Sequence, residues 1–416
     1  MSSYLRVLGL GFGDEGKGLV TDYLCRTLKN EGCSTNLVVR FSGGHQAGHT
    51  VCVGDVKHVF SNFCSGTFRG ATSYFFDSCV IDPIGIMNEY HILREKGAEP
   101  SLIIHPNCLI CTPYDKYANE QSEEMKEHGT CGMGVYTTLT REKNGYHLQA
   151  GDVKYQSVFK NKMKLLKQWY ENRNGVKLDL SLFEKAISFL NECEDIKIAI
   201  EETPHSYIIE EGSQGIMLDE MFGFFPHVTA TPVVPMKKKN DDMCETMLVT
   251  RAYCTRHGNG PLPNDFECDF LIPGTETNQE NKYQGKLRTC LLDMDMLRYA
   301  VDKYREYKNN NLTLVITCLD HLDPTKNESG EEIKHWKVVK EGEIVSFDTQ
   351  GDFVRYIASQ VGIYKLLLSR SPYSDFMKEL YVENKPHLYG DGYHISNEGC
   401  CASIGRFICA NNLVEK

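Results

Sequence analysis

Two carboxylates and a lysine lie in a run of closely spaced glycines near the start of the chain. The run extends from Leu8 to Gly18 and reads Leu-Gly-Leu-Gly-Phe-Gly-Asp-Glu-Gly-Lys-Gly. Glycines let backbone amides face an anion, and the start of a following helix adds positive potential. The run therefore predicts a phosphate-binding loop that contains Lys17. Asp14 and Glu15 would repel a phosphate, unless a metal ion bridges them to it or one of them acts as a base.

The same run departs from two common nucleotide-binding motifs. Residues 11–17 match the first seven positions of a P-loop, but Gly18 stands where a P-loop has the Ser or Thr that contacts Mg²⁺. Asp14 stands where a dinucleotide-binding fingerprint has Gly or Ala. The alternative for the acid pair is an exposed turn before a helix, where carboxylates interact favourably with the helix dipole.

A second glycine-rich loop contains two histidines. It extends from Phe41 to Thr50 and reads Phe-Ser-Gly-Gly-His-Gln-Ala-Gly-His-Thr, with the histidines at His45 and His49. A single histidine is usually structural, whereas two in a glycine loop at the end of a strand suggest that imidazole and backbone groups converge on a ligand.

Both loops follow short apolar runs, and such runs alternate with helical patterns along most of the chain. This alternation predicts an α/β fold with a large, mainly parallel central sheet and flanking helices. We expect one domain over residues 1–416, with a helical excursion near 155–195 and polar loops or hairpins at 236–242 and 326–342. The expected strands are 5–10, 36–41, 80–84, 102–104, 206–209, 248–253 and 312–319, and the clearest early helices are 19–30 and 85–96.

Composition excludes several classes of partner. The 416 residues include 56 acidic and 45 basic ones, a net charge of −11, so a basic surface for a nucleic acid polymer or an anionic membrane is not expected. No window approaches the roughly 18 apolar residues of a membrane span, and the first residues do not resemble a signal peptide. The 17 cysteines are scattered, which favours reduced thiols and a cytoplasmic location. The lone Cys108-x-x-Cys111 pair is read as chance placement.

Taken together, the two loops resemble those of the adenylosuccinate synthetase family. The family's Gly-Asp-Glu-Gly-Lys-Gly is unchanged at residues 13–18, and its Gly-Gly-x-Asn-Ala-Gly-His-Thr is matched at 43–50 with Gln46 for Asn. Residues 251–263 read Arg-Ala-Tyr-Cys-Thr-Arg-His-Gly-Asn-Gly-Pro-Leu-Pro, where the family has Lys-Ala-Tyr-x-Thr-Arg-Val-Gly-x-Gly-Pro-Phe-Pro. Further similar segments occur in the same order at 129–134, 211–219, 225–229 and 316–323.

The resemblance implies the adenylosuccinate synthetase fold, which is similar to that of P-loop NTPases. It also implies a homodimeric ligase that joins L-aspartate to IMP at the expense of GTP through a 6-phosphoryl intermediate, giving adenylosuccinate, GDP and phosphate. Asp14 would be the base, His49 the acid and Lys17 the cation at the transferring phosphoryl group. Mg²⁺ would be held by Asp14 and the Gly48 carbonyl, and Gln214 would contact the purine. The remaining nucleotide-binding residues implied are Gly13, Glu15, Gly16, Gly18, Gln46, Ala47, Thr50, Cys131, Arg141, Thr229 and Asp320.

The departures from the family fall mainly on ligand-binding positions. Cys131 replaces a threonine whose hydroxyl contacts the 5′-phosphate of the nucleotide, and a thiol is a weaker donor. Arg141 is the candidate for an arginine that the family donates across the dimer interface. The family's loop for the aspartate carboxylates has a counterpart at residues 283–289, which has lost both threonines and its last arginine. The residues assigned to this loop are Gln284, Gly285, Lys286 and Arg288.

Recognition of the guanine donor is altered as well. The family's Thr-Lys-Leu-Asp has become Thr-Cys-Leu-Asp at 317–320, so that Asp320 remains but the lysine over the base is replaced by Cys318. The nearest sequence to the family's C-terminal Ser-x-Gly-Pro is at 395–399. Two alternatives remain beside the synthetase: a phage-type relative that acts on dGMP or GMP with ATP, and a nucleotide-binding protein without ligase activity.

Overall fold

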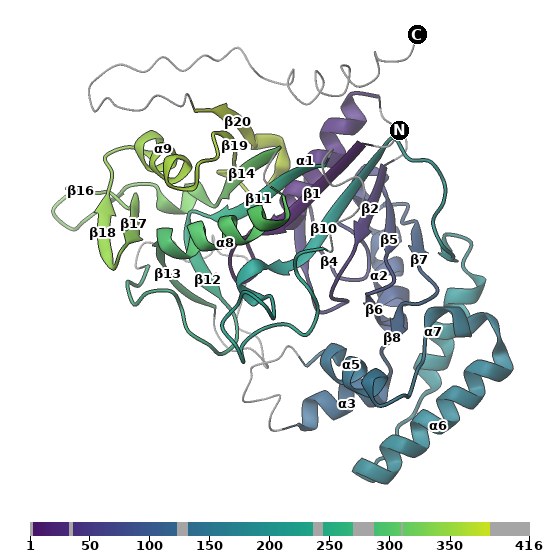
Figure 1. Ribbon diagram of the computed structural model, residues 1–416. Coiled ribbons are helices and arrows are strands. Elements are labelled where there is room, and N and C mark those ends of the chain that lie inside the picture. Colours follow the sequence, from purple (N-terminus) through teal and green to yellow (C-terminus); the bar gives the residue numbers. More distant parts are fainter. Residues whose placement is uncertain are drawn as a thin grey trace.

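The centre of the chain is a ten-stranded, mainly parallel sheet (Figure 1). The computed structural model describes residues 3–32, 36–122, 132–235, 244–268, 287–308 and 311–382. Neighbouring strands run parallel, except that the edge strand β20 is antiparallel to β19. The predicted fold class is therefore confirmed. In sheet order the strands are β20 (Lys378–Tyr381), β19 (Lys365–Leu368), β14 (Leu312–Thr317), β11 (Glu245–Arg251), β1 (Ser3–Gly9), β10 (Tyr207–Gly215), β2 (Asn36–Arg40), β5 (Thr72–Phe75), β7 (Leu102–Ile104) and β9 (Ile196–Ile198).

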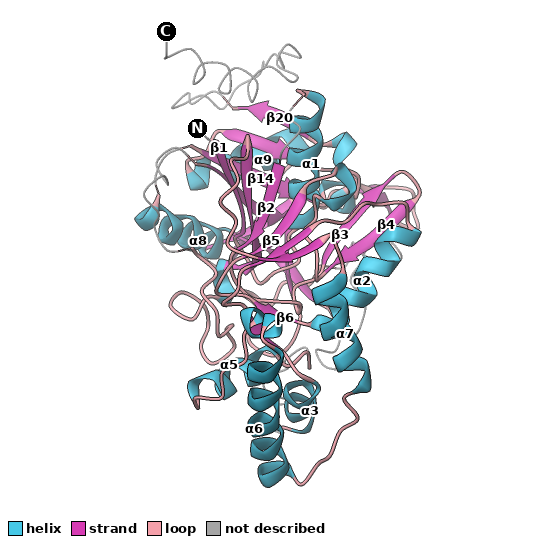
Figure 2. Cartoon of the chain, turned by 90° about the vertical axis from the view of Figure 1, so that its right-hand side faces the viewer, coloured by secondary structure: helices cyan, strands magenta, loops and turns pink. Residues whose placement is uncertain are grey.

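Helices cover both faces of this sheet, as Figure 2 shows. Successive side chains of a strand point to opposite faces. On β1, Leu5 and Val7 join the core that packs against α1 (Lys17–Asn30), whereas Leu8 joins the core beneath α8 (Met294–Tyr307) and α9 (Gln350–Val361). Parallel strands that are buried on both faces are apolar on both, which explains why the runs in the sequence are continuous rather than alternating.

Smaller elements surround the sheet. The segment expected as a strand at 80–84 is shorter than predicted: β6 ends at Ile81, because α2 begins at Pro83, a residue well suited to the first turn of a helix. The polar segment 326–342 contains strands of small sheets, as expected, whereas 236–242 lies outside the described residues. These smaller strands are β3 (His49–Val53), β4 (Val56–Phe60), β6 (Val80–Ile81), β8 (Leu109–Ile110), β12 (Tyr253–Arg256), β13 (Arg288–Asp293), β15 (Thr325–Lys326), β16 (Glu332–Ile333), β17 (Lys337–Lys340) and β18 (Glu343–Ser346).

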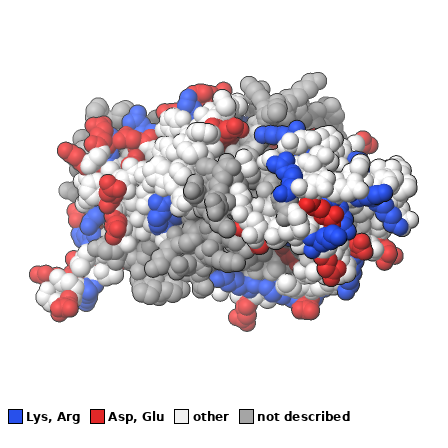
Figure 3. Space-filling model, turned by 90° about the horizontal axis from the view of Figure 1, so that it is seen from below, with Lys and Arg blue, Asp and Glu red and all other residues white. Residues whose placement is uncertain are grey.

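The expected helical excursion consists of α6 (Gln156–Asn174) and α7 (Ser181–Glu192). The other helices are α2 (Pro83–Glu95), α3 (Pro113–Gln121) and α5 (Val135–Lys143). Among the described residues, no helix is both long and apolar enough to cross a membrane. Figure 3 shows acidic and basic side chains interspersed over the described part of one face, with no continuous basic surface there.

Five adjacent strands bring the predicted loops to one edge of the sheet. The order β2, β10, β1, β11, β14 is continuous, and all five strands run in the same direction. Their carboxyl ends therefore meet at the same edge, which is where open α/β sheets usually bind ligands. The first glycine loop follows β1, the second follows β2, and the segments after β10, β11 and β14 lie beside them.

Candidate active site

The first glycine loop folds back on one of its own acids. Glu15 is buried, and its carboxylate accepts hydrogen bonds from the amides of Gly11, at 3.0 Å, and Gly13, at 2.8 Å. It also lies 2.7 Å from Lys17 Nζ. A Cβ atom at Gly9 would lie 2.3 Å from this carboxylate, so the close packing of the loop requires glycine there. Glu15 thus orients Lys17 from inside the loop and does not line the cavity.

Asp14 is held in an uncommon backbone conformation at the edge of the cavity. Its φ is 61°, a left-handed value that costs a residue with a side chain about 1 kcal/mol or more. Arg251 Nε donates to the carbonyl of Asp14 at 2.6 Å, and His257 Nε2 lies 3.5 Å from Asp14 Oδ2. Burial raises the pKa of Asp14, while Arg251 and His257 act in the opposite direction.

His49 is oriented by a buried carboxylate. Its Nδ1 lies 2.7 Å from Glu211 Oε1, and its Nε2 is buried without a hydrogen-bond partner in the described part of the chain. Burial, followed by the nearby Arg40, lowers the pKa of His49 to about 4. Burial alone would raise the pKa of Glu211, but Arg40 and His49 hold it below its ordinary value. Arg40 Nε lies 3.1 Å from Glu211, and the amide of Ser65 donates to the same carboxylate.

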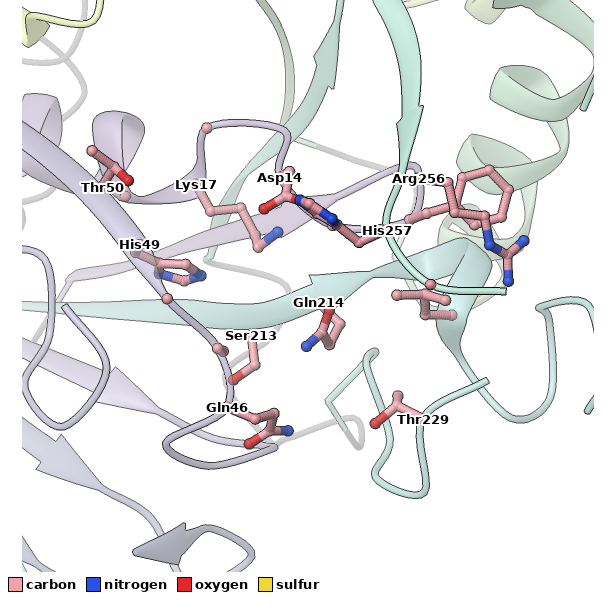
Figure 4. A pocket seen from close by; sticks show the side chains of 18 of the residues that line it. Asp14, Lys17, Gln46, His49, Thr50, Ser213, Gln214, Thr229, Arg256 and His257 are labelled. Atoms are coloured by element: carbon pink, nitrogen blue, oxygen red, sulfur yellow. The ribbon is translucent and has the colours of Figure 1, made fainter. Parts of the chain in front are cut away.

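Asp14, Lys17 and His49 border one cavity of about 1080 Å³. In Figure 4, Lys17, His49 and Gln214 lie around its centre, and Asp14 lies directly beside His257. The volume is of the size expected for a small-molecule site. Of the predicted residues, those that line the cavity are Gly13, Asp14, Gly16, Lys17, Gly18, Gln46, Ala47, Gly48, His49, Thr50, Gln214, Thr229 and Asp320.

Two basic residues do not have the surroundings expected for ligand contacts. Arg141 is fully buried: its Nε lies 2.9 Å from Asp115, its Nη2 donates to the Ile110 carbonyl, and its Nη1 donates to the Tyr146 carbonyl. This geometry contradicts the expectation that Arg141 crosses a dimer interface, because its guanidinium is satisfied inside its own subunit. Arg288 donates to the carbonyls of Gly258 and Gly260, at 2.6 and 2.8 Å, and does not line the cavity.

Other predicted residues lie away from the cavity or outside the described residues. His45, expected to converge on a ligand together with His49, is buried and hydrogen-bonds the Met133 carbonyl at 2.8 Å. Both thiols of the Cys108-x-x-Cys111 pair are buried, and burial raises the pKa of each. The residues that lie outside the described part of the chain are Cys131, Gln284, Gly285 and Lys286.

Sequence analysis missed several residues that line the cavity. Arg256 packs 4.3 Å from the centre of the Phe12 ring and donates to the carbonyls of Pro261 and His227. Burial and the neighbouring Arg288 lower the pKa of Arg256 to about 10. Lys57 and Lys143 also line the cavity, as does the segment 371–373, which reads Ser-Pro-Tyr. The segment 371–373 follows β19, the strand next to β14 in the sheet. The Ser-x-Ser-Pro sequence that starts at residue 369 was the feature from which this segment could have been identified.

Comparison with known proteins shows which family the chain belongs to. The family model described as adenylosuccinate synthetase matches residues 6–329. The chain belongs to the adenylosuccinate synthetase family. It is 33% identical to the adenylosuccinate synthetase of Thermodesulfovibrio yellowstonii over 354 residues, which cover 76% of this chain and 77% of the relative. It is 28% identical to that of Picrophilus torridus over 387 residues, which cover 86% of this chain and 89% of the relative. The chain is thus a ligase of the kind that forms carbon–nitrogen bonds in purine nucleotide biosynthesis.

Two solved structures share the fold. A fully ligated adenylosuccinate synthetase from Plasmodium falciparum superposes with a TM-score of 0.68 at 19% identity, covering 91% of this chain and 99% of that one. The succinoaminodeoxyadenylate synthetase of cyanophage S-2L, bound to dGMP and to dATP as an energy donor, gives a TM-score of 0.62 at 14% identity. The second superposition covers 99% of both chains. At these identities the likeness concerns the fold alone.

The residues at the cavity fit a magnesium ion that is shared with a substrate. Mg²⁺ usually binds through one or two carboxylates together with waters and substrate phosphates, rather than in an all-protein cage. Asp14 and Gly48, whose carboxylate and carbonyl are oxygen donors, both line the cavity. No group of three or more His, Cys, Asp or Glu side chains suited to a metal occurs in the described ranges. This donor set suits a shared Mg²⁺ better than a resident ion.

Proposed function

We propose that the chain condenses L-aspartate with IMP at the expense of GTP and forms adenylosuccinate, GDP and phosphate. The observation that carries the proposal is the convergence of Asp14, Lys17 and His49 on one cavity, which Gln214 also lines. A protein that only bound nucleotides would have no need of a carboxylate, a lysine and an oriented imidazole around the same space.

Asp14 is proposed to accept the proton from N1 of the 6-oxopurine, so that O6 can attack the γ-phosphate of the donor. A partly buried carboxylate with a raised pKa is a better base than a fully exposed one. The amine of aspartate then displaces the phosphate from C6, which forms the C–N bond and releases inorganic phosphate. Acid–base assistance of this kind typically contributes about 10²–10⁴-fold to a rate.

His49 and Lys17 are proposed to stabilise the transferring phosphoryl group. To donate from Nε2, His49 must carry both ring protons. Burial and Arg40 oppose that form by lowering the pKa of His49, whereas the Glu211 carboxylate beside Nδ1 favours it, as would the charge of a bound phosphoryl group. Lys17 is already oriented by Glu15 at 2.7 Å. When bound by Asp14 and the Gly48 carbonyl, Mg²⁺ would neutralise charge on the donor phosphates.

The cavity is proposed to contain two nucleotide subsites. Gln214, Thr229 and Gln46 are proposed to contact the purine nucleotide that accepts the phosphoryl group. Thr50 and Asp320 are proposed to contact the donor, with the hydroxyl-rich segment 369–373 on the same side. We further propose that the enzyme acts in the cytoplasm as a homodimer, as the resemblance implies.

A second candidate reaction uses dGMP or GMP with ATP. It is favoured by Cys318, which stands in place of the family's guanine-stacking lysine, and by the fold shared with the phage synthetase bound to dGMP and dATP. It is opposed by Asp14, because phage-type relatives tend to lose the aspartate of this loop.

One assay separates the two reactions. The purified protein is mixed with Mg²⁺ and aspartate, and IMP or dGMP is paired with GTP or ATP, while free phosphate and the purine absorbance change are followed. Product with IMP and GTP is expected. Product with dGMP alone would refute the proposal, and product with IMP and ATP alone would change only the donor.

A further inference from the structure

The turn that follows β12 carries a histidine where the family has valine. His257 lies in the segment 251–263, and Arg251 in the same segment replaces the family's lysine. Both residues line the cavity, and both contact Asp14. Two departures in one segment thus meet at the residue proposed as the base.

The two contacts restrain different parts of Asp14. The Arg251 guanidinium holds the backbone carbonyl of Asp14 at 2.6 Å, which supports a left-handed conformation that a residue with a side chain seldom adopts. His257 lies 3.5 Å from one carboxylate oxygen, Oδ2. Distances between catalytic groups are often long without substrate and shorten when it binds.

The surroundings of His257 favour a defined hydrogen bond. Its Nδ1 is buried and has no hydrogen-bond partner among the described residues, whereas its Nε2 faces Asp14. Nε2 is therefore the ring nitrogen placed to donate a hydrogen bond to the carboxylate. The next residue, Gly258, is held through its carbonyl by Arg288, which also donates to the Gly260 carbonyl and fixes the turn.

We propose that His257 is a positioning residue that holds Oδ2 of Asp14 and leaves the other carboxylate oxygen, Oδ1, to accept the proton of the purine. The assignment of that proton transfer to Asp14 rests on the proposed function, whereas the hold on the carboxylate does not. In this arrangement Arg288 supports His257 by fixing the turn. A base misplaced by about 1 Å can lose about 10²-fold in rate, so a modest contact can have a large effect.

The test compares two variants of His257 with the wild type. His257→Val restores the family's residue, so the fold should tolerate it, whereas His257→Gln keeps a donor of similar reach. We expect His257→Val to lower kcat about tenfold to a hundredfold, with the KM for IMP and GTP changed about threefold or less, and His257→Gln to recover most of kcat. His147→Val, at an exposed histidine, is the control and should leave kcat unchanged.

Crystal structures of the wild type and His257→Val provide a readout that does not depend on turnover. The Asp14 carboxylate is expected in one rotamer beside His257 in the wild type and in another, or in several, in the variant. The proposal is overturned if the Asp14 carboxylate has the same rotamer in His257→Val as in the wild type. It is also overturned if the valine variant has the same kcat as the wild type, or the same kcat as the glutamine variant. If the wild type turns over no nucleotide pair, the proposed reaction fails, and the crystal structures alone decide the role of His257.

Discussion

Replacing Glu211 by glutamine should affect stability and catalysis together, whereas the same change at Glu210 should affect stability alone. The two glutamates are consecutive on β10 and therefore point to opposite faces of the sheet. Glu211 is buried against Arg40 and His49, and Glu210 is buried against Arg6 at 2.6 Å. Each substitution leaves a buried arginine without its carboxylate, which typically costs about 3–5 kcal/mol.

Only Glu211 touches the proposed acid. Without the carboxylate beside Nδ1, His49 loses the partner that stabilises its doubly protonated form. We expect kcat for adenylosuccinate formation to fall about 10²-fold in Glu211→Gln, within the range of acid–base contributions. Glu210→Gln should retain kcat within about threefold at a temperature where it remains folded. Urea denaturation measures the stability of both variants, and steady-state kinetics measures their activity.

The pH dependence of stability gives an independent check on the same carboxylate. Because the pKa of Glu211 is lower in the folded chain than in the unfolded one, its contribution is fully present above an unfolded pKa of about 4.3. The contribution is lost as the pH falls through that value towards the folded pKa. The stability difference between wild type and Glu211→Gln should therefore be largest at neutral pH and should shrink below about pH 4. The reasoning is refuted if the difference is independent of pH, or if Glu210→Gln loses as much kcat as Glu211→Gln.

Four further substitutions test the assignments of single residues. Asp14→Asn should lower turnover by at least about 10²-fold while nucleotide binding, measured by calorimetry, changes little; turnover near that of the wild type would remove Asp14 from the base role. Arg141→Met should lower the urea midpoint, because it leaves the buried Asp115 carboxylate without a cation. Lys143→Met should instead raise the KM for a nucleotide substrate without that loss of stability. Cys318→Lys should lower the KM for GTP several-fold with kcat unchanged, because it restores the family's lysine at a position whose φ of 58° strains cysteine and lysine alike; an unchanged KM would show that this lysine is not needed.

The positions of the loops could be predicted because they depend on local patterns. Apolar runs that end in glycine-rich segments indicate strands whose carboxyl ends bear loops, and parallel pairing brings such ends to one edge. The assignment of Asp14, Lys17 and His49 to one catalytic site came from the resemblance of both loops to the family. The start of α2 was misjudged for a local reason as well, because Pro83 was taken into a strand although proline suits the first turn of a helix.

The orientation of side chains inside the site could not be predicted in the same way. Asp14 and Glu15 are adjacent acids, and nothing local decides which of them faces the ligand. Glu15 turns inward because Gly9 and Gly215 leave room for its carboxylate, and Gly215 belongs to a strand some two hundred residues later. Arg141 was misassigned for a similar reason, because Asp115, the carboxylate with which it forms a buried ion pair, lies on another helix.

The acidic character of the chain bears directly on how this site can bind anions. With a net charge of −11, nucleotides cannot be attracted by a general positive field and must be bound by individual cations. Lys17 is held by Glu15, and the Arg251 guanidinium is held by the Asp14 carbonyl and the hydroxyl of Tyr253. Each cation is thereby fixed before a ligand arrives, at the cost of part of its attraction for that ligand. Fixed charges need no reorganisation when the transition state forms, so such an arrangement favours turnover over tight binding of the ground state.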